Sequence, residues 1–235
     1  MFAAAAPRYD LLNHLLSMNV DRLWRRRVVQ ALRPRPGERI LDLCTGTGDL
    51  AFALSAGTGA SVVGADFCLP MLRIAARKAS KASPPPRWLQ ADALSLGFPA
   101  SSFDAVTVAF GVRNFEDVPR GITEIARVLG PGGRLAVLEF SEPKGRLFGP
   151  LYRFYFHRVL PAVGNWISGS RGAYSYLPAT VDGFPDPPAF GSLLEEAGLE
   201  VRSQEPLTGG IATLHLAVKP SKEPAGEAPE CGSRG

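Results

Sequence analysis

The sequence of 235 residues contains few cysteines and no long apolar run. Its three cysteines, Cys44, Cys68 and Cys231, lie far apart, so their spacing predicts neither a disulfide framework nor a zinc site. No stretch of about 18 apolar residues occurs, and we expect no membrane-spanning helix. The first residues, MFAAAAPRYD, lack the basic and apolar regions of a secretory signal. These absences favour a reducing cytoplasm.

Positive charge is present only in modest excess, with a formal net charge of +4, but it is unevenly distributed. Residues 22–39 hold seven arginines and the single acid Glu38. The arginines are Arg22, Arg25, Arg26, Arg27, Arg33, Arg35 and Arg39. Such a patch suits anionic lipid or nucleic acid, and a solvated helix face is an equally good interpretation. No RNA-binding module or basic groove with interleaved aromatics accompanies the patch, which argues against nucleic acid.

Short apolar runs alternate with helical patterns along most of the chain. A helical pattern over residues 8–32 ends before Pro34 and Pro36. We then expect seven strands, at residues 40–43, 61–66, 87–92, 103–112, 134–140, 199–203 and 209–219. Helices between most of them predict an α/β fold with a mostly parallel sheet. The short connection between the last two strands excludes a parallel pair, so the C-terminal pair is expected to be antiparallel.

The predicted division of the chain has three parts. Residues 1–35 form an N-terminal helical cap, residues 36–219 the main domain, and residues 220–235 a flexible tail. Within the main domain, residues 143–188 interrupt the alternation and include the aromatic stretch LFGPLYRFYFHRVLPAVGNWI. Two compatible interpretations are a helical excursion packed on the sheet and an apolar lid over a hydrophobic substrate.

The stretch RILDLCTGTGDLAFAL, residues 39–54, combines a buried strand, a glycine turn and the start of a helix. This layout presents backbone N–H groups and a helix N-terminus to a ligand. Gly46 and Gly48 match the first two glycines of the dinucleotide fingerprint, and Asp66 follows at the expected distance. The loop by itself does not distinguish a nicotinamide cofactor from another adenosine-containing ligand.

Acids at the ends of three successive strands favour S-adenosylmethionine over a dinucleotide. Asp42 at the first strand repels a pyrophosphate but suits the cationic amino-acid part of a sulfonium methionine. Asp66 ends the second strand, where a carboxylate can bind both ribose hydroxyls. Asp92, followed by Ala93, ends the third, where a carboxylate can accept from an adenine amino group. Each acid alone is weak support, because strand-end Asp often caps a helix.

Several segments resemble a known family. Residues 36–218 are similar to the class I S-adenosylmethionine-dependent methyltransferases, with a Rossmann-like fold. Within that class, APRYDLLNHLLSMNVDRLWRRR, LDLCTGTGDLA, FGVRNFEDV and GGRLAVLEFSEP resemble the ubiquinone/menaquinone biosynthesis C-methyltransferases. YSYLPATVDGFPD and TGGIATLHLAVK agree with that family too.

The resemblance implies methylation of a ring carbon in a prenylated hydroquinone. The APRYDLLN start resembles members that serve menaquinone alone, which implies conversion of demethylmenaquinol to menaquinol. Carried over by position, the cofactor contacts are Thr47, Asp66 and the pair Asp92-Ala93. Many relatives have Asn where this chain has Asp92, and some have Ser where it has Ala109, so any contact from that Ser hydroxyl is absent here.

The chemistry implied by the resemblance needs a nucleophilic ring carbon. Methyl transfer to carbon is an in-line displacement, and the ring becomes nucleophilic when an adjacent hydroxyl loses its proton. The protein must therefore accept that proton or stabilise the oxyanion. Arg113, just after the fourth strand, is expected in the second role, since a guanidinium is a base only through a bound water. The alternative for Arg113 is a surface salt bridge with Glu116 or Asp117.

Other candidate residues are less specific. Asn114 is expected to orient a water or a ring oxygen, and Tyr9 to contact the quinol or the cofactor, with core packing as the alternative. His157 in the lid segment is a candidate base, whereas His215 alternates within the last strand and is expected to be structural. No metal constellation appears, and this chemistry requires none.

A prenyl tail would place the substrate in a membrane. The arginine patch and the aromatic lid are therefore expected to meet the bilayer surface, on the inner face of the cell membrane. Three alternatives remain open: C-methylation of a methoxy-benzoquinol in ubiquinone biosynthesis, a nucleic-acid methyltransferase, and a non-catalytic protein that binds S-adenosylmethionine. The oligomeric state is not predicted.

Overall fold

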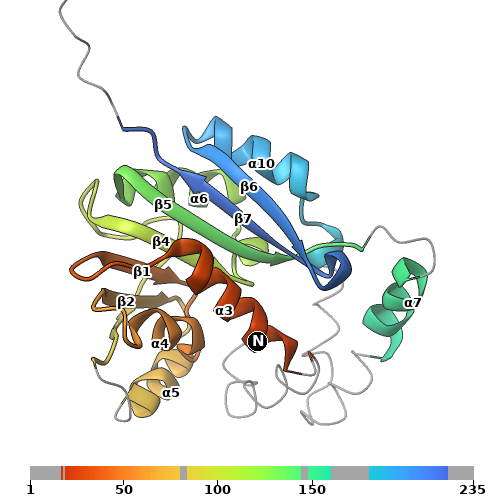
Figure 1. Ribbon diagram of the computed structural model, residues 1–235, viewed down its shortest axis with the longest axis horizontal. Helices are drawn as coiled ribbons and strands as arrows, with labels where there is room; N and C mark the ends of the chain where they lie inside the picture. The colour runs from red at the N-terminus through yellow and green to blue at the C-terminus, as the bar shows by residue number, and fades with distance from the viewer. Residues whose placement is uncertain (1–16, 18, 80–83, 144–147, 160–179, 222–235) are drawn as a thin grey trace, which may run out of the picture.

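The computed structural model describes residues 17, 19–79, 84–143, 148–159 and 180–221 of the chain. They form a seven-stranded sheet of order β3-β2-β1-β4-β5-β7-β6 (Figure 1). The strands are β1 (Arg39–Leu43), β2 (Ser61–Asp66), β3 (Arg87–Gln90), β4 (Phe103–Ala109), β5 (Leu129–Phe140), β6 (Glu200–Leu207) and β7 (Ala212–Val218).

Strands β1 to β5 are parallel, and their carboxyl ends align at one edge of the sheet. Leu43, the last residue of β1, pairs with Ala65 of β2 and Val108 of β4. Strand β7 is antiparallel to both β5 and β6. The predicted α/β fold, with a mostly parallel sheet and an antiparallel C-terminal strand, is confirmed.

Two strands are longer than the sequence pattern predicts. β5 begins at Leu129 rather than Arg134, because Leu129 pairs with Phe103 across a register shift in β4. β6 runs to Leu207, which pairs with Ala212 across the 3-10 turn η4 (Thr208–Gly210). Apolar alternation is weak over both extensions. The hydrogen-bond partner, and not the side-chain pattern, therefore determines where β5 begins and where β6 ends.

Helices cover both faces of the sheet. The α-helices are α3 (Val20–Leu32), α4 (Asp49–Ser55), α5 (Leu69–Ala79), α6 (Val118–Val128), α7 (Phe148–Phe154) and α10 (Pro187–Glu196). Alternate residues of β1 serve the two faces: Ile40 packs in the cluster with α3 and α4, whereas Leu41 and Leu43 pack in the cluster with α6 and α10.

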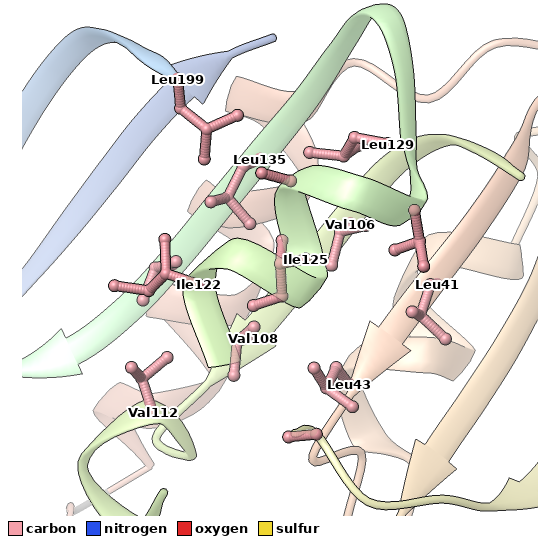
Figure 2. Close-up of a cluster of buried hydrophobic side chains, with 14 of the residues drawn as sticks. Leu41, Leu43, Val106, Val108, Val112, Ile122, Ile125, Leu129, Leu135 and Leu199 are labelled. Carbon is pink, nitrogen blue, oxygen red and sulfur yellow. The ribbon is translucent and has the colours of Figure 1, made fainter. Parts of the chain in front are cut away.

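Figure 2 shows the second of these clusters, where side chains from β1, β4, β5 and α6 converge. Ile122 and Ile125, both nearly free of solvent, point from α6 toward the strands. Full burial of each such side chain contributes about 1.5–3 kcal/mol to the free energy of unfolding. This cluster therefore packs one face of the sheet against α6 and α10.

The N-terminal helix is shorter than predicted within the described residues. α3 begins after Asn19, which has a left-handed backbone conformation with φ 61°, and Ser17 lies in a turn. The prediction of one helix over residues 8–32 is therefore wrong at Ser17 and at Asn19, because a left-handed residue interrupts the helical hydrogen bonds. The remainder of that prediction, residues 8–16 and 18, lies outside the described residues.

The predicted lid is described in two pieces. Helix α7 continues into a single π-helical turn, η3 (Tyr155–Val159), beyond the carboxyl end of β5 (Figure 1). The second piece, residues 180–188, leads into α10. In the parts of the chain that the structure describes, we find no helix with both the length and the apolar character needed to cross a bilayer.

Lys219, directly after β7, forms hydrogen bonds to α6 and β5. Its Nζ donates hydrogen bonds of 2.7 Å to the carbonyl oxygens of Ala126 in α6 and Leu129 in β5. Replacing Lys219 by Met keeps the aliphatic chain but leaves both carbonyls without this charged donor. We expect the free energy of unfolding to fall by about 1.5–3 kcal/mol in urea denaturation.

Arg202→Met is the matched control. Arg202 pairs with Glu200 on β6, and the two side chains are 59% and 50% exposed. An exposed pair of this kind contributes less than about 1 kcal/mol. A loss in Lys219→Met no larger than that in Arg202→Met would show that the two carbonyl contacts do not stabilise the fold.

Candidate functional site

The glycine loop lies at the carboxyl edge, between β1 and α4. Thr45 N–H donates to the carbonyl oxygen of Ala65 at 3.0 Å, and Gly48 N–H donates to that of Thr45 at 2.9 Å. These bonds hold the loop against the end of β2. The helix that follows begins at Asp49 with Gly48 as its N-cap.

Glycine is required at Gly48 for two separate reasons. Its φ of 87° is a left-handed conformation that side chains disfavour, and a Cβ there would lie 2.5 Å from the Trp88 ring. A Cβ on Gly64 in β2 would also lie 2.5 Å from that ring. Gly46, with φ 57°, has open space where its Cβ would be. The indole of Trp88 therefore supports the loop, while Gly46 leaves room for a ligand.

Asp66 joins the loop to the second strand. Its Oδ2 accepts from the Gly46 N–H and its Oδ1 from the Cys68 N–H, both at 2.8 Å. Burial raises the pKa of Asp66, and these two hydrogen bonds oppose the rise. Each oxygen keeps a second lone pair, so the carboxylate can bind ligand hydroxyls while it braces the loop.

Asp42 lies beneath the loop rather than open to a ligand, with 1% of its surface exposed. Its two oxygens accept from the hydroxyls of Thr45 at 2.6 Å and Thr107 at 2.7 Å. Burial raises the pKa of Asp42 to about 6, although both hydroxyls oppose the rise. Asp42 therefore places a buried carboxylate beneath the loop, with both of its oxygens engaged by threonine hydroxyls.

The third strand-end acid lies in a turn. β3 ends at Gln90, and the exposed Asp92 accepts from the Leu94 N–H at 2.9 Å, beside the buried Ala93. The Ala91 N–H donates to the carbonyl oxygen of Asp66, which ties this turn to the second strand end. The structure therefore brings the predicted cofactor residues Asp42, Gly46, Thr47, Gly48, Asp66, Asp92 and Ala93 to one edge of the sheet.

Arg113 forms a buried ion pair with Glu139, not the surface pair with Glu116 or Asp117 considered from the sequence. Its Nη1 donates to both Glu139 oxygens, at 2.6 and 3.1 Å, and the two side chains are 5% and 1% exposed. Asp117 instead caps α6 by accepting from the Arg120 N–H. The surface alternative is wrong because Glu139, at the end of β5, lies beside the short helix η2 (Val112–Asn114).

The other candidates are spread more widely. Asn114 is exposed, and its amide donates to the carbonyl oxygen of Phe110 at 3.5 Å. His157 Nε2, in the segment predicted to be a lid, lies 3.6 Å from an Asp182 oxygen. His215 is buried in β7, and burial lowers its pKa to about 4, so it is a neutral packing residue. Tyr9 lies outside the described residues.

Aromatic rings connect the sheet edge to α7 and η3. Phe110 after β4 and Phe140 at the end of β5 have ring centroids 4.5 Å apart, and Trp24 of α3 contacts both. Phe140 also contacts Phe156 of η3, which stacks on Tyr152 of α7. We call these five rings the aromatic cluster.

A cavity of about 670 Å³ opens beside the aromatic cluster. Its walls come from the end of β5 at Phe140, from α7 and from residues 181–187. The volume is in the usual range for small-molecule sites.

A model of the ubiE/COQ5 methyltransferase family matches residues 1–219. The chain belongs to this family. The resemblance found in the sequence motifs is thereby confirmed, as is the prediction of a methyltransferase.

Relatives of the ubiE/COQ5 family match over nearly the whole chain. The demethylmenaquinone methyltransferase of Thermus thermophilus is 54% identical over 94% of this chain and 100% of its own length. That of Deinococcus radiodurans is 46% identical, over 93% of this chain and 91% of its own. The ubiquinone/menaquinone biosynthesis C-methyltransferase UbiE of Geobacter sulfurreducens is 44% identical, over 93% and 87%.

Solved structures share the fold at low sequence identity. A SAM-dependent methyltransferase from Aquifex aeolicus has a TM-score of 0.61 and 18% identity, over 83% of this chain and 89% of its own. The [4+2]-cyclase SpnF has a TM-score of 0.66 and 21% identity, over 87% and 83%. Because a cyclase shares it, the fold of the ubiE/COQ5 family does not by itself specify the reaction.

Three residues of the site were missed by reasoning from the sequence. Glu139 lies in an apolar strand pattern, where an acid is unusual and signals a buried partner. No sequence pattern indicates the role of Trp88, because Trp88, Gly48 and Gly64 lie in three different segments that only the fold brings together. Phe67, which is 72% exposed directly after Asp66, is a large apolar side chain at the edge.

The buried carboxylate of Asp42 predicts a pH-dependent difference in stability. Its pKa is about 6 in the folded protein against an ordinary value of 3.8, so the folded state takes up the proton first as the pH falls. From about pH 7 to about pH 4, the free energy of unfolding of the wild type should therefore rise relative to Asp42→Asn. Urea denaturation across this range measures the difference.

Thr107→Val provides the matched comparison. It removes one hydrogen bond that lowers the pKa of Asp42, so the same rise should begin at a higher pH. A difference between wild type and Asp42→Asn that stays constant from pH 7 to pH 4 would contradict a raised pKa for Asp42.

Proposed function

We propose that this enzyme transfers a methyl group to a ring carbon of demethylmenaquinol, giving menaquinol. The observation that carries the proposal is the position of Arg113, a buried guanidinium at the same sheet edge as the glycine loop. Its central carbon lies 5.3 Å from the centroid of the Phe140 ring, in the aromatic cluster. Positive charge beside apolar rings suits an aromatic substrate that develops an oxyanion. The full-length similarity to two demethylmenaquinone methyltransferases supports the same substrate.

The methyl donor is S-adenosylmethionine, and the residues at the carboxyl edge fit it. The open space at Gly46 admits a ligand close to the backbone, and the free lone pairs of Asp66 suit two ribose hydroxyls. Asp92 accepts a single local hydrogen bond and can accept another from an adenine amino group. Phe67 offers an exposed ring for an adenine face. When bound, the group supplies an electrophilic methyl.

Arg113 has the central part in our mechanism. The quinol hydroxyl would lose its proton to a bound water and on to solvent, which places negative charge on oxygen and on the ring carbons, and a permanently charged guanidinium stabilises that charge. The ring carbon would then gain the methyl group as the bond from that methyl to sulfur breaks, and the ring hydrogen would leave to solvent as a proton, which restores the aromatic ring. The exposed Asn114 lies next to Arg113 in η2 and is proposed to orient a water or ring oxygen. Tyr9 remains a proposed contact of the quinol or the cofactor.

The lid and the cavity are proposed to hold the apolar part of the quinol. Phe140, Val181, Phe184 and four prolines form the apolar part of the cavity wall, which suits a prenyl chain. The rest of the wall is polar and includes the charged residues Glu142, Arg153, Asp182 and Asp186. Residues 143–188 then act as the lid within a main domain of residues 36–219, between a helical cap of residues 1–35 and a tail of residues 220–235. This division of the chain is part of the proposal.

The proposed membrane contact is narrower than the sequence suggested. Arg25 forms an ion pair with Asp21, and Arg27 forms one with Glu205. The charges of these two arginines are therefore already paired within the protein. Arg22 and Arg26 remain exposed on α3, beside Leu23, which is 59% exposed. An apolar side chain between two exposed cations is suited to the headgroup region of an anionic bilayer.

A second candidate substrate is the methoxy-benzoquinol of ubiquinone biosynthesis. The observation in its favour is the 44% identity to a relative named for both quinones. We expect purified enzyme with labelled S-adenosylmethionine to methylate reduced demethylmenaquinone and to leave the methoxy-benzoquinol unchanged.

The assay separates three results. Product from both quinols would make this a dual-substrate enzyme and contradict the narrower proposal. If neither quinol is methylated while calorimetry still detects cofactor binding, the quinol proposal is wrong and the cofactor site stands.

The membrane contact predicts a loss of vesicle binding on removal of the exposed α3 residues. A variant with Arg22→Gln, Leu23→Gln and Arg26→Gln should bind vesicles containing anionic phosphatidylglycerol at least about thirtyfold less tightly in low salt, since each of the two basic residues contributes about 1 kcal/mol. Sedimentation with vesicles measures the affinity.

The control for vesicle binding keeps α3 intact. Arg120 is exposed on α6, and Arg202 is exposed on β6, so Arg120→Gln with Arg202→Gln removes two charges elsewhere. Equal binding by the two sets of variants would exclude α3 as the contact surface.

A further inference from the structure

The pair formed by Arg113 and Glu139 is unusual in its burial. Glu139 is the penultimate residue of β5, and Arg113 lies in η2 directly after β4. Because Ala109 and Leu138 are paired in register, the residues that follow them meet at the carboxyl edge. Burial of two opposite charges costs more desolvation than a surface pair and is weak support for stability by itself.

The guanidinium of Arg113 is only partly satisfied. Nη1 donates to both oxygens of Glu139, but Nε is buried and has no hydrogen-bond partner among the described residues. A buried donor without a partner costs free energy and calls for an explanation. Nε is closed to solvent, so a ligand oxygen would satisfy this N–H once a covering side chain moves aside as the ligand binds beside the aromatic cluster.

We propose that Glu139 is a positioning residue for methyl transfer, which holds the Arg113 guanidinium in one orientation with its Nε–H reserved for an oxygen of the aromatic substrate. The inference rests on the proposed function and deepens it. A long arginine side chain has many rotamers, and fixing its planar end before the substrate arrives reduces the entropic cost of the transition state. Glu139 itself, 1% exposed behind Arg113, does not need to touch the substrate.

The surroundings of Glu139 make its charge sensitive to pH. Burial raises its pKa to about 7, and the charge and hydrogen bonds of Arg113 oppose the rise. Cys44, after β1, is influenced by Glu139 and by the acids Asp42 and Asp66, and burial raises the pKa of its thiol. On β7, the neutral His215 pairs with Val137, and the uncharged Thr213 pairs with Glu139. Glu139 is therefore the group whose ionisation controls its contact with Arg113.

A double-mutant cycle tests whether Glu139 acts through Arg113. In the intact protein with saturating S-adenosylmethionine and demethylmenaquinol, Glu139→Gln should lower kcat by about tenfold to a hundredfold. Cofactor affinity by calorimetry should stay unchanged, because the glycine loop is not altered. In an Arg113→Met background, Glu139→Gln should cause no further loss of kcat, since the orientation of Arg113 no longer matters.

The pH profile gives a readout that a merely structural role would not change. In the wild type, kcat should fall as the pH decreases through about 7, where Glu139 takes up a proton and holds Arg113 less firmly. Glu139→Gln should remove this step and leave any step from Asp42, whose pKa is about 6. Glu139→Asp, which keeps the charge but retreats by one methylene, should restore part of kcat and the step.

Glu38→Gln is the matched control. Glu38, just before β1, accepts a hydrogen bond from Arg134 of β5, away from the carboxyl edge of the sheet. The two side chains are 15% and 21% exposed. This variant should keep wild-type kcat and the step near pH 7. The thermal midpoint of each variant shows whether it is folded at the assay temperature.

Two outcomes would overturn the positioning role. One is a loss in Glu139→Gln that recurs in full in the Arg113→Met background. The other is a wild-type step near pH 7 that survives in Glu139→Gln. An absence of methyl transfer to any quinol by the wild type would instead overturn the proposed function. In that case, equal affinity of the wild type and Glu139→Gln for the reduced naphthoquinone, measured by calorimetry, would overturn the positioning role as well.

Discussion

Parallel pairing of β1 with β2 and β4 is the constraint on which the site depends. Between two parallel strands, the connection has to cross back to the end of the sheet where the first strand began. The carboxyl ends of the parallel strands therefore all lie at one edge. Here that edge receives the glycine loop, three strand-end acids, and Arg113 with its partner Glu139, which come from segments as far apart in sequence as Asp42 and Glu139. The polar groups have no alternative place, because the residues before them are packed in two apolar clusters.

The edge divides into two regions with different chemistry. Around β1 to β3, backbone N–H groups and carboxylates bind one another, as Asp66 does with Gly46 and Cys68, and leave lone pairs for a polar ligand. Around β4 and β5, the guanidinium of Arg113 lies over the ring of Phe140, which contacts the ring of Phe110. A polar, charged methyl donor and an aromatic acceptor can therefore be bound side by side without competing for the same groups.

Much of this arrangement is predictable from the sequence, because strand periodicity and the glycine turn are local signals. The mostly parallel sheet and the clustering of Asp42, Asp66 and Asp92 at its carboxyl edge follow from alternating strands and helices, whereas the order of the strands does not. The partner of Arg113 was not predictable, since Glu139 lies on another strand and only the register joins them. Acids near in sequence, such as Asp117, were the obvious partners, but Asp117 is used as a helix cap. The extent of β5 was missed for the same reason: pairing partners distant in sequence decide it.

The indole of Trp88 has a consequence for how this site can change. The ring of Trp88 fills the space that a Cβ would need at Gly64 in β2 and at Gly48 in the loop. These three positions, in separate segments, therefore form a single packing unit. A side chain at Gly64 would fit only if position 88 became smaller, and a smaller residue there would remove the support of the loop. Substitutions at these three positions are therefore expected to occur together. A redesign of the glycine loop has to choose all three residues at the same time.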